Sequence, residues 1–391
     1  MAVLILLAGL SPWATDMYLS AFPDMQTEWG TSPSAVQMTL TGFLIGMAAG
    51  QLLIGTLSDG LGRRGLLLIG SVAFTVCSLL CAIAPTIELL ILIRAVQGFA
   101  GAAGVVLSRA VISDASHGHS AARRFAILTS IGAMAPVVAP LFGNVVLALG
   151  NWRLIFVSLA ALGVLMTAGT LTWIPETLPA CRRGGISVRA NLQRMHQLLT
   201  QRTFAGYVIV GSLAQASLMT YVAASSFVLR STYGVPPALY SVIFSINAVG
   251  IVGAAALFGV LAGRFRHQVL LAAGLMWGAF GATALLIFSL MGQPPLWLTC
   301  ACFFTQTSAT GLLMTAIMSL TQADSAGSSG AASALVGGSR LLAGASVIPL
   351  TGLVGTDSLV PMAIIMSTLM VASLVTYRQS GPTRPAEVEE T

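Results

Sequence analysis

Residues 55–65 read Gly-Thr-Leu-Ser-Asp-Gly-Leu-Gly-Arg-Arg-Gly and form a short polar turn between two apolar stretches, at residues 34–57 and 66–84. A helix needs about 20 apolar residues to cross the hydrocarbon core of a bilayer, and both stretches are long enough. The turn therefore predicts two membrane-spanning helices joined by a tight loop. Gly55 and Gly62 permit close approach in it, Asp59 is placed to cap the helix ends, and Arg63 to anchor the loop at the inner face of the membrane.

The same alternation of apolar stretches and polar breaks runs along the whole chain. Hydrophobic residues make up 56% of the 391 residues and charged residues only 8%, whereas soluble domains carry roughly 25% charged residues. Lipid must therefore cover most of the surface. We predict an all-α membrane protein of about twelve spans, at residues 2–22, 34–57, 66–84, 88–111, 125–148, 154–174, 204–227, 237–261, 268–290, 295–320, 328–351 and 358–377.

The placement of arginines predicts the orientation, because cytoplasmic loops are enriched in basic residues. Loops after even-numbered spans, the linker and the C-terminal tail hold Arg63, Arg64, Arg123, Arg124, Arg182, Arg183, Arg189, Arg194, Arg202, Arg264, Arg266, Arg378 and Arg384. The opposite side holds only Arg153 and Arg230. We therefore expect both termini in the cytoplasm.

The longest predicted loop, residues 175–203, divides the chain into two six-helix bundles at residues 1–174 and 204–378, with a cytoplasmic tail at residues 379–391. Two such bundles with a substrate site between them are a transporter architecture. Within the loop, Val188, Leu192, Met195 and Leu199 lie at helical spacing. This spacing indicates a short amphipathic helix on the inner membrane surface, and a solvated linker explains the stretch equally well.

Asp16 is the most informative single residue, since it is the one acid well inside an apolar span. A carboxylate at membrane depth is costly, so such residues normally face the interior of the bundle and act on ions or substrates. We expect Asp16 to carry protons and to contact the substrate. The alternative is that it lies near the outer interface and only caps that end of the helix.

Two arginines also lie within predicted spans. Arg94 in the fourth span would act in proton coupling, or would serve a structural role by binding backbone carbonyl groups. Arg340 in the eleventh span poses the same question, with the structural interpretation favoured.

The fifth span contains Pro136, Pro140 and Gly143. Prolines remove helical hydrogen bonds and bend a helix, and small residues let a partner helix approach closely, so we expect these three to act in the conformational switch. Polar and flexible residues of other spans are candidates to line a substrate cavity, each against the alternative of ordinary helix packing. They are Tyr18, Gln37, Gln215, Met219, Tyr221 and Asn247.

Several functions are excluded or disfavoured. All 18 basic residues are arginine, so neither a P-loop nor Schiff-base chemistry on lysine is available. No metal-ligand spacing and no hydrolase motif is found, and the arginines lie in short loops rather than on one nucleic-acid-binding face. We expect no enzyme activity, no cofactor, no metal site and no nucleic-acid partner.

The turn at residues 55–65 resembles the loop signature of the major facilitator superfamily, and Arg94-Ala-Val-Gln-Gly98 resembles its arginine motif in the fourth span. Ala135-Pro-Val-Val-Ala-Pro-Leu-Phe-Gly143 resembles a motif of its drug/proton antiporters. Thr15-Asp-Met-Tyr-Leu19 is similar to the first span of the Bcr/CflA subfamily of bacterial multidrug exporters. Some relatives carry a second acid in this span where the chain has Ala8, so Asp16 would act alone.

The resemblance implies a monomeric, proton-coupled exporter of small amphipathic drugs, of the phenicol or bicyclomycin type, in the bacterial inner membrane. It also implies that the turn at residues 55–65 stabilises an outward-open state. Two alternatives remain. One is a transporter of a specific metabolite, such as a sugar or amino acid, on the same fold. The other is a membrane protein that transports nothing, such as a receptor or a membrane-embedded transferase.

Overall fold

A computed structural model describes residues 1–391 except 116–117, 180–182, 184–187, 326–328, 354–357 and 381–391. In this part of the chain, 11 helices are long and apolar enough to cross a membrane, and there are up to 12 spans when the bent pair Ala2–Ala8 and Leu10–Trp29 is taken as one. Many large apolar side chains on the outside of the bundle are exposed, as expected for a lipid-facing surface. The predicted all-α membrane fold is confirmed.

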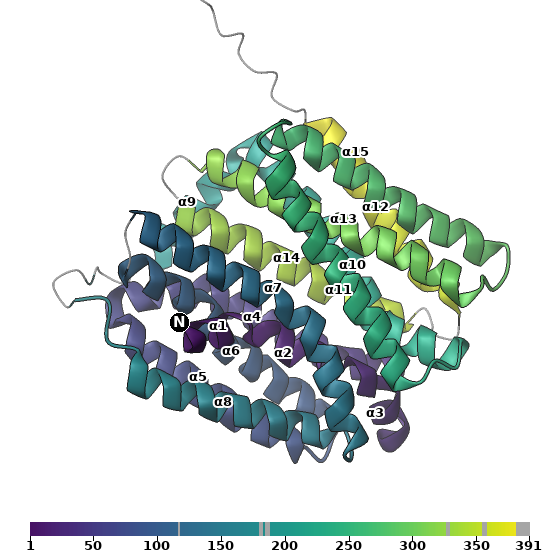
Figure 1. Ribbon diagram of the computed structural model, residues 1–391, viewed down its shortest axis with the longest axis horizontal. Helices are drawn as coiled ribbons and strands as arrows, with labels where there is room; N and C mark the ends of the chain where they lie inside the picture. Colours follow the sequence, from purple (N-terminus) through teal and green to yellow (C-terminus); the bar gives the residue numbers. More distant parts are fainter. Residues whose placement is uncertain (116–117, 180–182, 184–187, 326–328, 354–357, 381–391) are drawn as a thin grey trace, which may run out of the picture.

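The helices form two bundles that lie side by side (Figure 1). The first contains α1 (Ala2–Ala8), α2 (Leu10–Asp16), the 3₁₀ turn η1 (Leu19–Ala21), α3 (Phe22–Trp29), α4 (Pro33–Leu61), α5 (Arg63–Ala82), α6 (Ile87–Ala115), α7 (Gly118–Ala148) and α8 (Arg153–Trp173). The second contains α10 (Arg202–Phe227), the π-helical turn η3 (Val228–Thr232), α11 (Pro237–Leu261), α12 (His267–Leu290), α13 (Leu296–Ala323), α14 (Ser329–Leu353) and α15 (Leu359–Ser380).

A short helix, α9 (Val188–Thr200), lies in the segment between the two bundles. Met195 and Leu198 are buried against the protein, whereas Leu192 and Leu199 are exposed. The side-chain amide of Asn191 donates to the hydroxyl of Thr56 in α4 over 3.0 Å. The predicted helix in this loop is therefore present, and it rests on the bundles through one of its faces.

The first span, which was expected at residues 2–22, is a broken helix. It bends by 46° at Gly9, and Pro12 follows in the first turn of α2. Glycine weakens a helix interior, and proline cannot donate the hydrogen bond that would reach back across the bend. A second break follows Asp16, where α2 ends before η1 begins. The sequence stretch that holds Asp16 thus lies between two interruptions of the helix.

Glycines bring the main helix pairs of each bundle into close contact. A Cβ atom added at Gly46 of α4 would collide with the carbonyl oxygen of Ala95 in α6, and one added at Gly98 of α6 would collide with Phe43 of α4. In the second bundle, a Cβ atom at Gly311 of α13 would collide with the carbonyl of Ile251 in α11. Both bundles therefore use the same packing device, in which small residues allow backbones to touch.

The two ends of the molecule differ in how the bundles meet. We name them the Arg63 end, where α4 joins α5, and the Arg230 end, where α10 finishes. Between the described parts of the two bundles, hydrogen bonds are found from the middle of the molecule to the Arg230 end, and include Ser34 to Pro349 and Gln37 to Ala223. The bundles are therefore held together most firmly at the Arg230 end.

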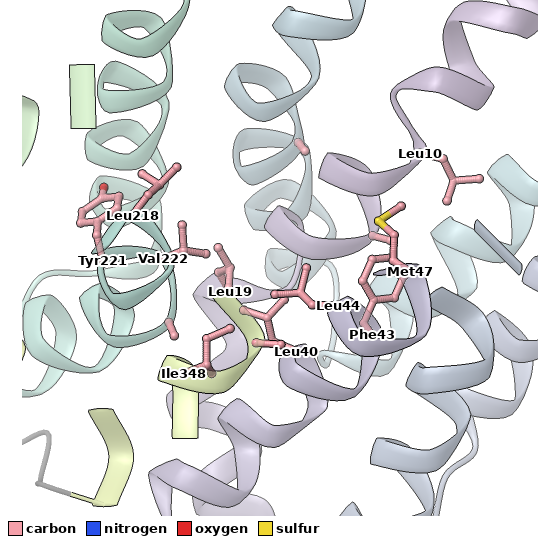
Figure 2. Packing of buried hydrophobic residues seen from close by; sticks show 14 of the residues in the cluster. Leu10, Leu19, Leu40, Phe43, Leu44, Met47, Leu218, Tyr221, Val222 and Ile348 are labelled. Carbon is pink, nitrogen blue, oxygen red and sulfur yellow. The ribbon is translucent and has the colours of Figure 1, made fainter. Parts of the chain in front are cut away.

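Apolar side chains complete this contact. Leu19, Leu40 and Leu44 of the first bundle belong to the same buried cluster as Val222 and Ile348 of the second. Figure 2 shows these side chains gathered where α10 and α14 approach the first bundle. Asp16 lies three residues before Leu19 in the chain, so it lies next to this apolar contact.

Candidate functional site

Asp16 is a buried carboxylate that has no cationic partner among the described residues. Its side chain ends α2 and is 9% exposed, and the Thr15 hydroxyl lies 2.8 Å from Oδ1. No described arginine forms an ion pair with it. Its charge acts on the hydroxyl groups of Tyr221 and Tyr240, which belong to the second bundle. The turn η1, which follows Asp16, contacts α10 and α11 of the second bundle, so Asp16 lies near the boundary between the bundles.

Arg94 supports the backbone just before Asp16. Its side chain is fully buried, and its guanidinium donates to the carbonyl of Ala14 over 2.9 Å and to the side chain of Gln97 over 2.7 Å. Ala14 lies in the last turn of α2, where carbonyl groups lack a partner within the helix. Arg94 thus binds a backbone carbonyl, as in the structural interpretation, and forms no hydrogen bond or ion pair with Asp16.

Aromatic rings surround the same guanidinium. Its carbon lies 4.6 Å from the centre of the Tyr18 ring and 4.3 Å from that of Phe43. Tyr18 is fully buried, with its hydroxyl 3.3 Å from that of Thr39. In this arrangement Tyr18 stabilises a buried cation, and its predicted contact with substrate stays a prediction.

A chain of polar groups crosses the second bundle. The side-chain amide of Asn247 donates to the Tyr221 hydroxyl over 2.9 Å, and the Thr307 hydroxyl donates to the Asn247 oxygen over 3.1 Å. The Tyr221 ring stacks on Phe244 with centroids 5.7 Å apart. Tyr221 and Asn247 were predicted to share a cavity, and the structure brings them together. Thr307 was missed because one threonine among many in apolar spans gives no sequence signal.

Gln37 and Met219 lie at other contacts. The Gln37 side chain donates to the carbonyl of Ala223 over 3.1 Å and accepts from the Thr351 hydroxyl over 3.1 Å. Gln37 therefore bridges α4 to α10 and α14. Met219 is half-buried against α14, where a Cβ atom at Gly344 would lie 2.6 Å from its Cγ.

Span five packs along the broken first span. A Cβ atom at Gly143 of α7 would collide with the carbonyl of Met17, the residue after Asp16. Pro136 and Pro140 lie inside α7, and the carbonyl of Val137 between them accepts from the Ser245 hydroxyl of α11 over 2.7 Å. α7 thus contacts both the Asp16 segment and the second bundle.

The turn after α4 is the centre of an ionic network. Gly62 adopts a φ of 99°, which other residues rarely adopt. Arg63 bonds Asp59 over 2.7 Å and Asp114 at the end of α6 over 3.1 Å. Gly55 lies one turn earlier in α4 and packs loosely against Val106 of α6. The sequence analysis predicted neither of these ion pairs, since it gave Asp59 a capping role and Arg63 an anchoring role.

Glu176 caps the helix that begins at Arg63. Its carboxylate accepts from the backbone N–H groups of Arg63 and Arg64 over 3.0 and 3.3 Å. Burial by itself raises the pKa of the Glu176 carboxyl, but hydrogen bonds from Leu178, Arg63 and Arg64 and the charge of Arg183 together lower that pKa below its usual value. An acid at a helix N-terminus is stabilised by the helix dipole. This contact links the start of the linker to the turn.

The family model for the Major Facilitator Superfamily matches residues 4–349. The chain therefore belongs to the Major Facilitator Superfamily, and it is a membrane transporter rather than an enzyme. It is 35% identical over 374 residues to the uncharacterized MFS-type transporter YdgK of Bacillus subtilis, covering 95% of this chain and 93% of that protein.

Two further relatives are similar to the chain. The bicyclomycin resistance protein homolog of Haemophilus influenzae is 29% identical over 378 residues, covering 95% of this chain and 93% of that protein. The multidrug resistance protein MdtL of Shigella flexneri is 27% identical over 239 residues, covering 61% and 60%. These relatives confirm the predicted likeness to the Bcr/CflA exporters.

Solved structures agree on the fold. A bacterial homolog of the human lysosomal transporter Spinster, in an inward-facing and occupied conformation, matches with a TM-score of 0.79 at 15% identity, covering 97% of this chain and 95% of that chain. A D-xylose–proton symporter matches with a TM-score of 0.76 at 16% identity, covering 97% of both chains.

Proposed function

We propose that this protein exports small amphipathic drugs across the bacterial inner membrane in exchange for protons. The observation that carries the proposal is Asp16, a buried carboxylate between the bundles that no described arginine neutralises. The charged form of such a group is costly at membrane depth, and a bound proton or a polar substrate removes that cost. A proton and a drug molecule therefore compete for the charged carboxylate of Asp16.

The contacts around Asp16 supply the coupling. Arg94 and Gly143 hold the backbone on either side of it, through Ala14 and Met17. Its charge reaches Tyr221 and Tyr240 in the second bundle. A change of protonation at Asp16 therefore alters the interaction between the bundles, which is what alternating access between an N-terminal bundle at residues 1–174 and a C-terminal bundle at residues 204–378 requires.

The arginine-rich loops support a cytoplasmic location for the Arg63 end and for both termini. In that orientation the structure is closed on the outer side, at Arg230. The network of Asp59 and Arg63 lies within the first bundle and the linker in this state. We assign this network a stabilising role in the outward-open state as well. In that state the Arg63 end is closed and the turn at residues 55–65 contacts the second bundle. The proton-driven cycle needs one chain only, so the transporter acts as a monomer.

The test is drug export by the native chain and by Asp16→Asn in an efflux-deficient bacterial host, with chloramphenicol and bicyclomycin as substrates. Glu88→Gln is the matched control, because Glu88 is an exposed acid in the first turn of α6. We expect native chain and control to raise resistance and to expel drug against its gradient when a proton gradient is present. Asp16→Asn should insert normally and lose uphill export. Uphill export by Asp16→Asn would remove Asp16 as the proton carrier.

A specific metabolite is the second candidate substrate. The polar chain of Tyr221, Asn247 and Thr307 favours it, because a site built from fixed hydrogen-bonding groups selects a matching polar ligand. Unchanged resistance to the whole drug panel, together with proton-driven uptake or release of one sugar or amino acid by vesicles, would decide for this alternative.

A further inference from the structure

Arg340 is a cation inside the second bundle with an incomplete set of partners. It lies near the middle of α14, and its guanidinium donates to the side-chain oxygen of Gln215 in α10 over 2.7 Å. Its Nε is buried and makes no hydrogen bond. Its Cδ lies 4.0 Å from the position of a Cβ atom at Gly211, so the stem follows α10. A neutral amide is thus the one hydrogen-bond partner of this charge in the described structure.

Arg109 is a second cation inside a span, and it is exposed. It lies near the Arg63 end of α6, within one turn of Val106, which packs next to Gly55 of α4. In the part of the chain that the structure describes, its side chain has no hydrogen bond and no ion pair. Arginine at this depth is expensive without a partner or water.

Arg109 and Arg340 lie near the same stretch of α4, because Gly55 of α4 packs next to Val106 of α6 and Leu52 of α4 packs next to Gly338 of α14. α6 ends at the Arg63 end, since Asp114 in its last turn binds Arg63. α14 runs the opposite way, since Pro349 near its end binds Ser34 at the start of α4. Cα–Cβ bonds tilt toward the N-terminus of their own helix, so the bond of Arg109 is directed away from the Arg63 end and that of Arg340 toward it. Their charges act on each other.

The described acids are engaged elsewhere or lie apart from this pair. Asp24, Glu28, Asp59, Asp114 and Glu176 each form an ion pair with another arginine. Glu88 lies at the opposite end of α6. Asp324 follows the end of α13 and interacts with Tyr207, and Asp16 interacts with Tyr221 and Tyr240. The Arg109–Arg340 pair therefore carries uncompensated positive charge between the bundles.

We propose that Arg109 and Arg340 form a binding site for an anionic group, a carboxylate or a phosphate, between the two bundles. The planar fork of arginine matches both oxyanions, and a shared anion removes the repulsion of two like charges. This inference rests on the proposed export function and deepens it, since it assigns weakly acidic or phosphorylated molecules as the favoured substrates. The headgroup of an anionic lipid offers the same chemistry.

The site can be tested by binding alone, without a proton gradient. The probes are fluorescein, an anion, and rhodamine 6G, a cation built on the same ring system. Fluorescence anisotropy with the purified full chain in detergent should show saturable fluorescein binding. Arg109→Gln and Arg340→Gln should each weaken it at least about tenfold, because hydrogen bonds between ionised groups are about twice as strong as those between neutral groups. Rhodamine binding should not weaken.

Arg264→Gln is the matched control, because Arg264 is an exposed arginine in the loop after α11 at the same end. Arg340→Lys keeps the charge and should retain part of the affinity. Folding of every variant is checked by gel filtration and helical circular dichroism. If the native chain binds fluorescein but exports no drug, the anion site is supported and the proposed export function is contradicted. Failure of the site and failure of the export function are therefore distinguishable.

A second measurement distinguishes the source of the anion. Phosphatidylglycerol that co-purifies with the native chain, and is lost in Arg109→Gln and Arg340→Gln, would assign the site to a lipid headgroup even where fluorescein does not bind. Failure of the native chain to bind either anion, or equal binding of both by the two variants, would overturn the proposal.

Discussion

The guanidinium of Arg230 donates two hydrogen bonds of 3.0 Å to the two carboxylate oxygens of Asp24. Arg230 lies in η3, after α10 of the second bundle, and Asp24 lies in α3 of the first. The same guanidinium also donates to the carbonyl of Ser20 over 2.6 Å. This bidentate pair ties the bundles together at one end of the molecule, so it resists any motion that separates them there.

Breaking this pair should shift the molecule toward the state that is open at the Arg230 end. The Asp24 side chain is 43% exposed, and such ion pairs contribute about 0.2–1 kcal/mol, so we expect a change in population of at most about fivefold. The measurement is labelling of Ser34→Cys by a membrane-impermeant maleimide, in a chain whose five cysteines are replaced by serine. Arg230→Gln should raise the rate, and the exchange Asp24→Arg with Arg230→Asp should restore it. An unchanged rate in Arg230→Gln would show that the pair does not hold this end closed.

Arg94→Ala should destabilise the first bundle. The substitution leaves the Gln97 oxygen and the Ala14 carbonyl without their donor, and each unsatisfied buried group costs about 1–3 kcal/mol. We expect a clearly lower midpoint of thermal unfolding in detergent, with a smaller loss in Arg94→Lys. Arg266→Ala removes an exposed arginine and should leave the midpoint unchanged. Equal midpoints for Arg94→Ala and the native chain would contradict the structural role of Arg94.

Gly46→Ala should prevent close packing of α4 on α6. The new methyl group would collide with the carbonyl of Ala95, which belongs to the helix backbone and cannot move aside alone. We expect little folded protein in the membrane fraction and a broad unfolding transition. Gly253→Ala is the matched control in α11, where no atom lies within 4 Å of the new methyl group. It should fold normally, since alanine is the better helix former by up to about 1 kcal/mol.

Glu176 should make stability depend on pH at the acidic end. Its pKa is lower in the folded protein than the ordinary value of 4.5. The stabilisation of the folded protein by Glu176 is therefore complete above about pH 4.5. It is lost as the pH falls through the lower pKa that Glu176 has in the folded protein. Thermal unfolding from pH 7 to pH 3 should show a smaller loss of stability in Glu176→Gln than in the native chain. Glu88→Gln should follow the native curve, and identical curves for both variants would count against the helix-capping role.

Hydropathy, arginine placement and one buried acid could be read from the sequence, because each depends on local composition. The number of spans follows from runs of apolar residues near membrane thickness. The proposed importance of Asp16 follows from the cost of a carboxylate at that depth. The spacing of Asp59 and Arg63 by one helical turn also permits the ion pair that the structure contains, although the sequence analysis did not predict it.

Tertiary structure decided the rest, because the remaining features join residues far apart in the chain. The sequence alone did not show that Arg94 would bind the carbonyl of Ala14, since that carbonyl is freed only where α2 ends. The sequence alone also did not show that Arg109 lies near Arg340. Their nearness depends on α6 and α14, two helices of opposite direction from different bundles. Composition along the chain determined that this protein lies in a membrane and where its charges are, and helix packing decided which of those charges are neutralised.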